Sequence, residues 1–142
     1  MKNIRTLLTI ALLLAATTVC VQAQERSMLT VTVPFAFTVE NINLPAGPYT
    51  VFALPPYSMT VKLQGVYGQK AVTIRAIPSR SSAGAAQGKL LFSRIGNEYF
   101  LSQVWEQGSK VHRDFFLGNR AKELAKNRTN GQLKTLVAVT AH

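Results

Sequence analysis

Residue types that catalysis uses come together once in this sequence, at His112-Arg113-Asp114. Adjacent side chains of an extended strand point to opposite faces, so His112 and Asp114 would share one face and Arg113 would lie on the other. A histidine beside a carboxylate is a pairing that serves general acid and base catalysis. The sequence supplies no serine in a nucleophile-elbow pattern and no oxyanion site to accompany it. We therefore interpret the cluster as the solvated end of a strand and expect no catalytic residues.

The usual signatures of metal and cofactor sites are missing as well. The only histidines are His112 and the terminal His142, and the six acidic residues are scattered along the chain, so no spacing matches a metal site. The glycines are spread over separate turns and form no Gly-rich strand-to-helix element that would cradle phosphate. The sequence predicts neither a metal site nor a cofactor.

Positive charge gathers toward the C-terminus, where from residue 110 onward seven basic residues accompany two acidic ones. Residues 120–128 have helical spacing of apolar positions, with Asn119 as the expected N-cap and Asn130-Gly131 as the stop. One turn of such a helix separates Lys122 from Lys126. With their flanking residues they form the candidate anion-binding surface: Arg120, Lys122, Lys126 and Arg128. The alternative is a solvated helix face that keeps the protein soluble.

An export signal is predicted for residues 1–23. A basic start at Lys2 and Arg5 precedes an apolar run over residues 7–19, and Val21-Gln22-Ala23 is typical of a signal peptidase site. The run is shorter than the roughly 20 residues that cross a bilayer. We expect cleavage after Ala23, no transmembrane segment in the mature chain, and a location in the periplasm or the medium.

Cys20 raises the alternative of a lipoprotein, in which that residue carries the lipid. The preceding Thr17, Thr18 and Val19 do not match the Leu-small-small pattern of such processing. Cleavage after Ala23 would remove the only cysteine and leave 14 basic residues against six acidic ones, a net charge of +8. A charge of this sign attracts anionic partners, for which acidic polysaccharide, an anionic lipid surface, extracellular nucleic acid and an envelope protein are the candidates.

The elements that would carry these residues are mostly strands. Large apolar side chains alternate with small or polar ones between Leu29 and Val39, and Pro34 marks a bend between two short strands. Turn residues over 41–47 and a hairpin turn at Gly96-Asn97 separate further strands. Pro78 should end a strand, and residues 79–88 should form a mobile loop. The further strands are expected at residues 49–54, 58–64, 70–77, 89–95, 98–105, 110–116 and 132–141.

About eight short strands with regular turn signals predict a mainly β protein. The expected fold is an antiparallel β-sandwich or a small closed barrel with one short C-terminal helix. Residues 24–142 should form a single domain, because a chain of this length supports one core. This is the fold class on which the functional hypotheses rest.

Three segments carry a family resemblance: residues 37–51 (FTVENINLPAGPYTV), 99–105 (YFLSQVW) and 121–125 (AKELA). Together they resemble a group of short, secreted, uncharacterised β-rich proteins of soil bacteria. That resemblance implies export and a compact β domain, and it brings no activity or functional residue with it. Separately, Leu44-Pro45-Ala46-Gly47 followed by Tyr49 is similar to the start of a strand in transthyretin-like and carboxypeptidase-regulatory-like sandwiches.

These observations favour a non-catalytic exported β domain that binds an anionic envelope component or a partner protein. A carrier of small apolar ligands, with the apolar strand faces enclosing a cavity, is the first alternative. An enzyme of unknown reaction is the last, because the sequence offers only His112 and Asp114 to build on.

Overall fold

A computed structural model describes residues 25–54, 59–68, 70–127 and 135–141 of the chain. The protein is mainly β, with ten strands and one short helix in this part of the sequence. The helix, α2, spans Asn119–Lys126, and no helix within these ranges is long and apolar enough to cross a membrane. The strands are β1 Arg26–Val33, β2 Phe37–Val39, β3 Ile42–Leu44, β4 Gly47–Ala53, β5 Thr60–Gly65, β6 Ala71–Arg80, β7 Lys89–Ile95, β8 Glu98–Trp105, β9 Val111–Phe115 and β10 Thr135–Thr140.

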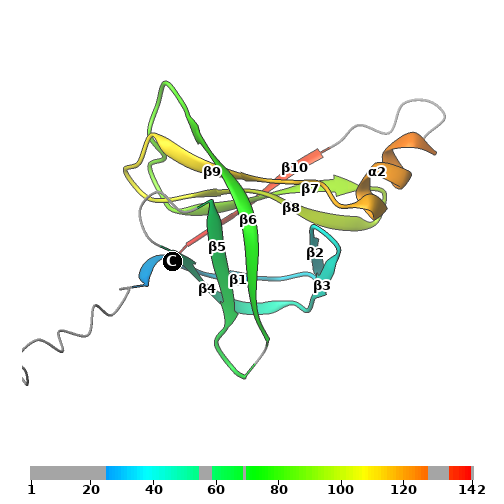
Figure 1. The fold of residues 1–142 in the computed structure, drawn as a ribbon, viewed down its shortest axis with the longest axis horizontal. Coiled ribbons are helices and arrows are strands. Elements are labelled where there is room, and N and C mark those ends of the chain that lie inside the picture. The colour runs from blue at the N-terminus through cyan, green and yellow to red at the C-terminus, as the bar shows by residue number, and fades with distance from the viewer. Residues whose placement is uncertain (1–24, 55–58, 69, 128–134, 142) are drawn as a thin grey trace, which may run out of the picture.

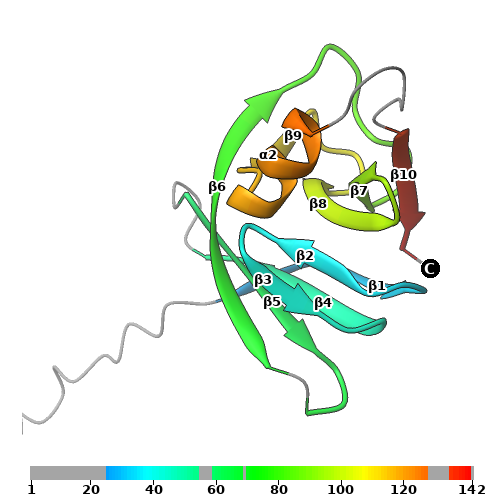
Figure 2. The ribbon, with the colours of Figure 1, turned by 90° about the vertical axis from the view of Figure 1, so that its right-hand side faces the viewer.

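The strands form two layers that share β6 (Figures 1 and 2). The lower layer has the order β1-β4-β5-β6, and the upper layer continues as β6-β9-β8-β7-β10. The short β2–β3 hairpin joins the upper layer through a parallel pairing of Thr38 with Phe100. Among the described strands, β1 pairs only with β4 and β10 only with β7, so the sheet does not close. The sandwich alternative is therefore confirmed and the closed barrel is not.

Strand β6 passes from one layer into the other because its two halves pair with different neighbours. Residues 71–75 pair with β5, and residues 76–80 pair with β9. The expectation that Pro78 ends this strand was wrong. The N–H of Ala76 donates to the Met59 carbonyl on the β5 side, and alternate residues direct their N–H groups to the same edge. The backbone nitrogen of Pro78 therefore faces the β5 edge at a point beyond the start of β5. A residue without an N–H loses no ladder hydrogen bond there.

The core lies between the two layers and follows the predicted alternation. Along β1 and β2, Leu29, Val31, Val33, Phe37 and Val39 are buried, and the bend between the strands occurs at the expected proline. Burying one face of each strand against the other layer is what stabilises a sandwich of this kind.

The hairpin of β7 and β8 has the bounds that the sequence predicts, 89–95 and 98–105. Its turn holds Gly96 at a φ of 66°, a conformation that glycine adopts without steric cost. Two other expectations need correction. The predicted turn over 41–47 contains a strand, β3, which pairs with β2, and the total is ten strands instead of about eight.

Tyr49 lies at the centre of the aromatic part of the core. Its ring is fully buried and meets Phe37 edge to face, with 5.3 Å between the ring centroids. Its hydroxyl donates a hydrogen bond of 2.7 Å to the carbonyl of Pro45. Burial raises the pKa of Tyr49 above its ordinary value, because the phenolate would lie away from water.

Replacing Tyr49 by phenylalanine should lower the free energy of unfolding by about 1 kcal/mol at neutral pH, since the hydrogen bond to Pro45 is lost. A raised pKa stabilises the fold below the unfolded value near pH ~10 and loses that contribution as the pH rises through the folded value. The Tyr49→Phe variant should therefore show a shallower loss of stability above pH ~10 in urea titrations. Tyr67, which is 82% exposed, gives the control variant Tyr67→Phe, and equal pH profiles for the two variants would contradict the prediction.

Candidate functional site

Helix α2 packs on the outer face of the upper layer. Its buried residue Ala121 contacts Ile95 of β7 and Phe100 of β8, with Leu117 and Leu124 at the margin of this second apolar cluster. The small apolar residue faces the sheet, as helical spacing predicts. Docking on the sheet accounts for the stability of a helix of only eight residues, which would be marginal alone.

The start of α2 differs from the sequence expectation. Its N-cap is Gly118, without a capping side chain, and Asn119 is the first helical residue. The N–H of Asn119 instead donates a hydrogen bond of 2.9 Å to Oδ1 of Asn41, from the β2–β3 turn. Asn41, which is distant in the sequence, thus takes the capping role that was expected of Asn119. The helix ends at Lys126. The predicted stop at Asn130-Gly131 lies outside the described residues.

The β2–β3 turn and the start of α2 are in direct backbone contact. A β-carbon on residue 118 would lie 1.6 Å from the carbonyl oxygen of Glu40, so only glycine fits there. Glu40 forms a parallel bridge with Leu117 and has a φ of 53°, in the left-handed region that residues with a β-carbon rarely adopt. This contact fixes one wall of the candidate site.

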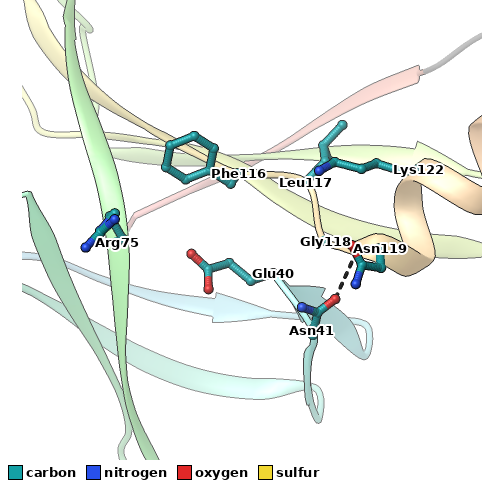
Figure 3. A pocket seen from close by; sticks show the side chains of 8 residues that line it. All are labelled: Glu40, Asn41, Arg75, Phe116, Leu117, Gly118, Asn119 and Lys122. Atoms are coloured by element: carbon teal, nitrogen blue, oxygen red, sulfur yellow. Dashed lines mark hydrogen bonds between the residues drawn. The ribbon is translucent and has the colours of Figure 1, made fainter.

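A hollow of about 420 Å³ opens between this contact and β6. Glu40 and Asn41 form its floor, Arg75 of β6 and Lys122 of α2 approach it from different sides, and the ring of Phe116 lies at its wall (Figure 3). Phe116 is 48% exposed. The hollow therefore combines two cations, one carboxylate, one amide and one aromatic ring.

The two cations of the hollow form no ion pair with another described residue. Within the described part of the chain, neither Arg75 nor Lys122 has a carboxylate within 4.0 Å. The guanidinium of an arginine offers a planar fork of donors that suits carboxylate or phosphate, and lysine offers a compact charge. The arrangement can bind an anionic group, while the carboxylate of Glu40 can accept hydrogen bonds from a hydroxyl or an amine.

The four residues of the predicted anion-binding surface lie in different settings. Lys122 and Lys126 are exposed on α2, whereas Arg120 pairs with Glu98 at the start of β8, with 2.7 Å between Nη2 and Oε1. The hydrogen bond and the charge of Glu98 raise the pKa of Arg120. Arg128 lies outside the described residues. Of the three described residues in the predicted set, only Lys122 lines the hollow.

Sequence reasoning missed Glu40, Asn41, Arg75 and Phe116 as members of one site. Alternation along residues 70–77 does place Arg75 on the face opposite to the buried Val72, Ile74 and Ala76. That pattern carries no information about the turn or the helix that lies opposite, so the site could not be assembled from it.

His112 and Asp114 do share a face, as predicted, with 3.6 Å between Nε2 and Oδ2. The strand end is not solvated, however, because His112 is buried and stacks on Trp105 with 4.1 Å between the ring centroids. Asp114 accepts hydrogen bonds from Ser79 and from Gln103, the latter at 2.7 Å. Serine therefore contacts the carboxylate and not the imidazole, which is not the order of a nucleophilic triad. In the described residues, no group of three His, Cys, Asp or Glu side chains could hold a metal ion.

Arg113 points the other way, toward the space between the layers. Its Nη1 lies 3.6 Å from the sulfur of Met28 on β1, and its Nε is buried without a hydrogen-bond partner among the described atoms. Burial lowers the pKa of Arg113, and the charge of Glu106 opposes that shift. This residue contributes to the inner face and not to the hollow.

Comparison of the chain with protein-family models gives no match. No curated protein and no solved structure is significantly similar to it either. The resemblance to secreted β-rich proteins of soil bacteria stays a prediction.

Substituting Gly118 by alanine should lower the free energy of unfolding by about 2–4 kcal/mol, because the added methyl group overlaps the Glu40 carbonyl and forces the two backbones apart. The control is Gly88→Ala, where the nearest atom to the new β-carbon is 3.4 Å away and a loss below about 1 kcal/mol is expected. Urea denaturation measures both variants. Similar stabilities for the two would show that the turn and the helix are not in fixed contact.

Proposed function

We propose that this protein is an exported, non-catalytic β domain that binds an anionic component of the cell envelope. The binding face is the outer face of the upper layer, around the hollow and α2. A single observation carries the proposal: within the described residues, Arg75, Lys122 and Lys126 form no ion pair, so these cations of the face stay available to an anionic ligand.

Ion pairs within the described residues use three of the six acidic residues. Glu106 pairs with Arg26, Glu25 pairs with Lys62 at 2.9 Å, and Glu98 pairs with Arg120. Asp114 is engaged by Ser79 and Gln103. Only Glu40 and Glu123 are left: Glu40 lines the hollow with Arg75 and Lys122, and Glu123 lies on the basic helix α2.

Other cations are held by uncharged partners. Lys89 lies over the ring of Trp105 and Arg94 over the ring of Tyr99. The cations for which the described structure gives no such contact are Lys70, Arg75, Arg80, Lys110, Lys122 and Lys126. Arg75 and Lys122 line the hollow and Lys126 lies farther along α2. Arg80 and Lys110 lie at the other end of the β6–β9 pair. Like charges gathered on one face raise the local concentration of an anionic ligand.

No observation in the described structure favours the apolar-ligand carrier or the enzyme over this proposal. Asp114 accepts hydrogen bonds from Ser79 and Gln103, and His112 stacks on Trp105, which supports a structural role for this pair.

Charge removal on the proposed face should weaken binding more than equal removal elsewhere. A variant with Arg75→Gln, Lys122→Gln and Lys126→Gln should bind acidic polysaccharide or anionic vesicles about 10- to 100-fold more weakly at low salt, since each cation near an anionic surface contributes about 1 kcal/mol. The control carries Arg26→Gln, Lys62→Gln and Lys70→Gln in the lower layer and has the same net charge. Sedimentation with vesicles and affinity electrophoresis with acidic glycans, at low and high salt, measure the difference. Equal losses in both variants, or binding that salt does not weaken, would contradict the proposal.

Export is tested by determining the N-terminus of the protein that is recovered outside the cytoplasm. Mass spectrometry should find an unlipidated chain that begins at or near Gln24, because the predicted peptidase site ends at Ala23. A chain that keeps residues 1–23 would contradict export by this leader. An acylated start at Cys20 would replace a diffusing domain with a membrane-tethered one.

A further inference from the structure

We infer that the hollow between α2 and β6 is a binding site for a sugar acid, that is, a pyranose unit that carries a carboxylate, as in the acidic chains of polysaccharides. This inference rests on the proposed function and narrows it, because it chooses one class of anionic ligand and one site. It is carried by the mixture of groups in the hollow and not by positive charge alone.

The size of the hollow suits such a unit. Its volume is about 420 Å³, within the range of roughly 300–1,000 Å³ that is usual for small-ligand sites. It lies between β6, the β2–β3 turn and the start of α2 (Figure 3).

The two cations of the hollow can bind the carboxylate of the sugar acid. Arg75 of β6 and Lys122 of α2 both line the hollow, from different sides, so the carboxylate of a ligand has a cation within reach on either side. A guanidinium binds a carboxylate through two parallel hydrogen bonds, and such charge-assisted bonds are stronger than neutral ones.

Glu40 argues against a densely charged ligand. A carboxylate only accepts hydrogen bonds and would repel a phosphate or sulfate placed beside it. A sugar acid presents hydroxyl donors next to its single charge, so Glu40 can accept from a hydroxyl while Arg75 and Lys122 hold the carboxylate. Oδ1 of Asn41 is occupied by the N–H of Asn119, which directs the amide N–H groups of Asn41 to other acceptors.

Phe116 provides an apolar surface at the wall of the hollow. Its side chain is 48% exposed, and Ile77, on the same outer face of the neighbouring strand, is 42% exposed. One face of a pyranose ring presents C–H bonds, which pack on an aromatic ring and remove both surfaces from water. A phosphate group or a bare polyanion would gain nothing from this ring.

The floor of the hollow is held in place before any ligand arrives. Glu40 keeps a φ of 53°, and its carbonyl lies against Gly118 so closely that no side chain fits between. Backbone strain of this kind occurs where a site is held in a fixed geometry, and a fixed geometry lowers the entropy cost of binding.

Isothermal titration calorimetry with defined tetrasaccharides tests the inference. The probes are tetragalacturonate, tetramannuronate and the methyl ester of tetragalacturonate, and dextran sulfate serves as a polyanion without carboxylates. At least one of the two free acids should bind. The methyl ester of tetragalacturonate should bind at least about tenfold more weakly than tetragalacturonate itself, because the ester lacks the charge that Arg75 and Lys122 recognise. If only tetramannuronate binds, its own methyl ester replaces the galacturonate ester in this comparison.

Two variants separate the site from general electrostatics. Phe116→Ala should weaken binding of the preferred acid by about fivefold or more and leave binding of dextran sulfate unchanged, since it removes an aromatic surface and no charge. The matched control is Tyr67→Ala, which removes an aromatic ring that is 82% exposed between β5 and β6 and should change neither. Circular dichroism and thermal unfolding establish that both variants are folded, and if Phe116→Ala is not, Phe116→Leu replaces it.

The outcomes distinguish the two proposals. Binding of dextran sulfate or anionic vesicles without binding of either tetrasaccharide would overturn the sugar-acid inference and leave the proposed function standing. Equal affinity for an acid and its methyl ester, or an unchanged affinity in the folded Phe116 variant, would also overturn the inference. Failure of every anionic probe to bind would overturn both. Selective binding of galacturonate or of mannuronate would support the inference and identify the kind of polysaccharide.

Discussion

The continuity of β6 is the constraint on which the rest of the structure depends. This ten-residue strand pairs with β5 along one half and with β9 along the other, so it carries the lower layer into the upper one. Its alternation directs Val72, Ile74 and Ala76 into the core and places Arg75 and Ser79 on the outside. The same strand therefore builds the core and positions outer residues that belong to two different clusters.

Helix α2 divides the outer face of the upper layer into regions with different properties. Where it docks on Ile95 and Phe100, the face is apolar and covered. Beside it lies the hollow with Arg75 and Phe116. Farther along the sheet Trp105 stacks on His112 and donates a hydrogen bond to Gln103. The hollow is thus bounded by a helix, a turn and a strand, and the backbone contact at Gly118 sets the distance between the helix and the turn.

Local sequence signals predicted those parts of the fold that local physics determines. The bounds of β7 and β8 follow from apolar runs on either side of Gly96-Asn97, and the buried face of β1 follows from alternation. The signals failed where a distant segment determines the structure. Pro78 continues a strand because it lies beyond the start of β5, and the first N–H of α2 is bound by Asn41. The candidate site was predictable only in part, as a basic helix surface with Lys122, because the strand and turn that complete it are brought there by tertiary contacts.

The shared strand also has a consequence for the order of folding. The antiparallel pairs β4–β5–β6 and β7–β8–β9 join segments that are neighbours in the sequence, so each set can form early and locally. Docking β9 on β6 closes a loop over residues 81–110, and pairing Thr38 with Phe100 closes a longer one. Loop closure of this kind costs entropy before its contacts form, which slows folding. We expect the hollow, which needs both closures, to be among the last parts of the molecule to form, and the unpaired edge of β6 to be the exposed, aggregation-prone surface of the intermediate that precedes it.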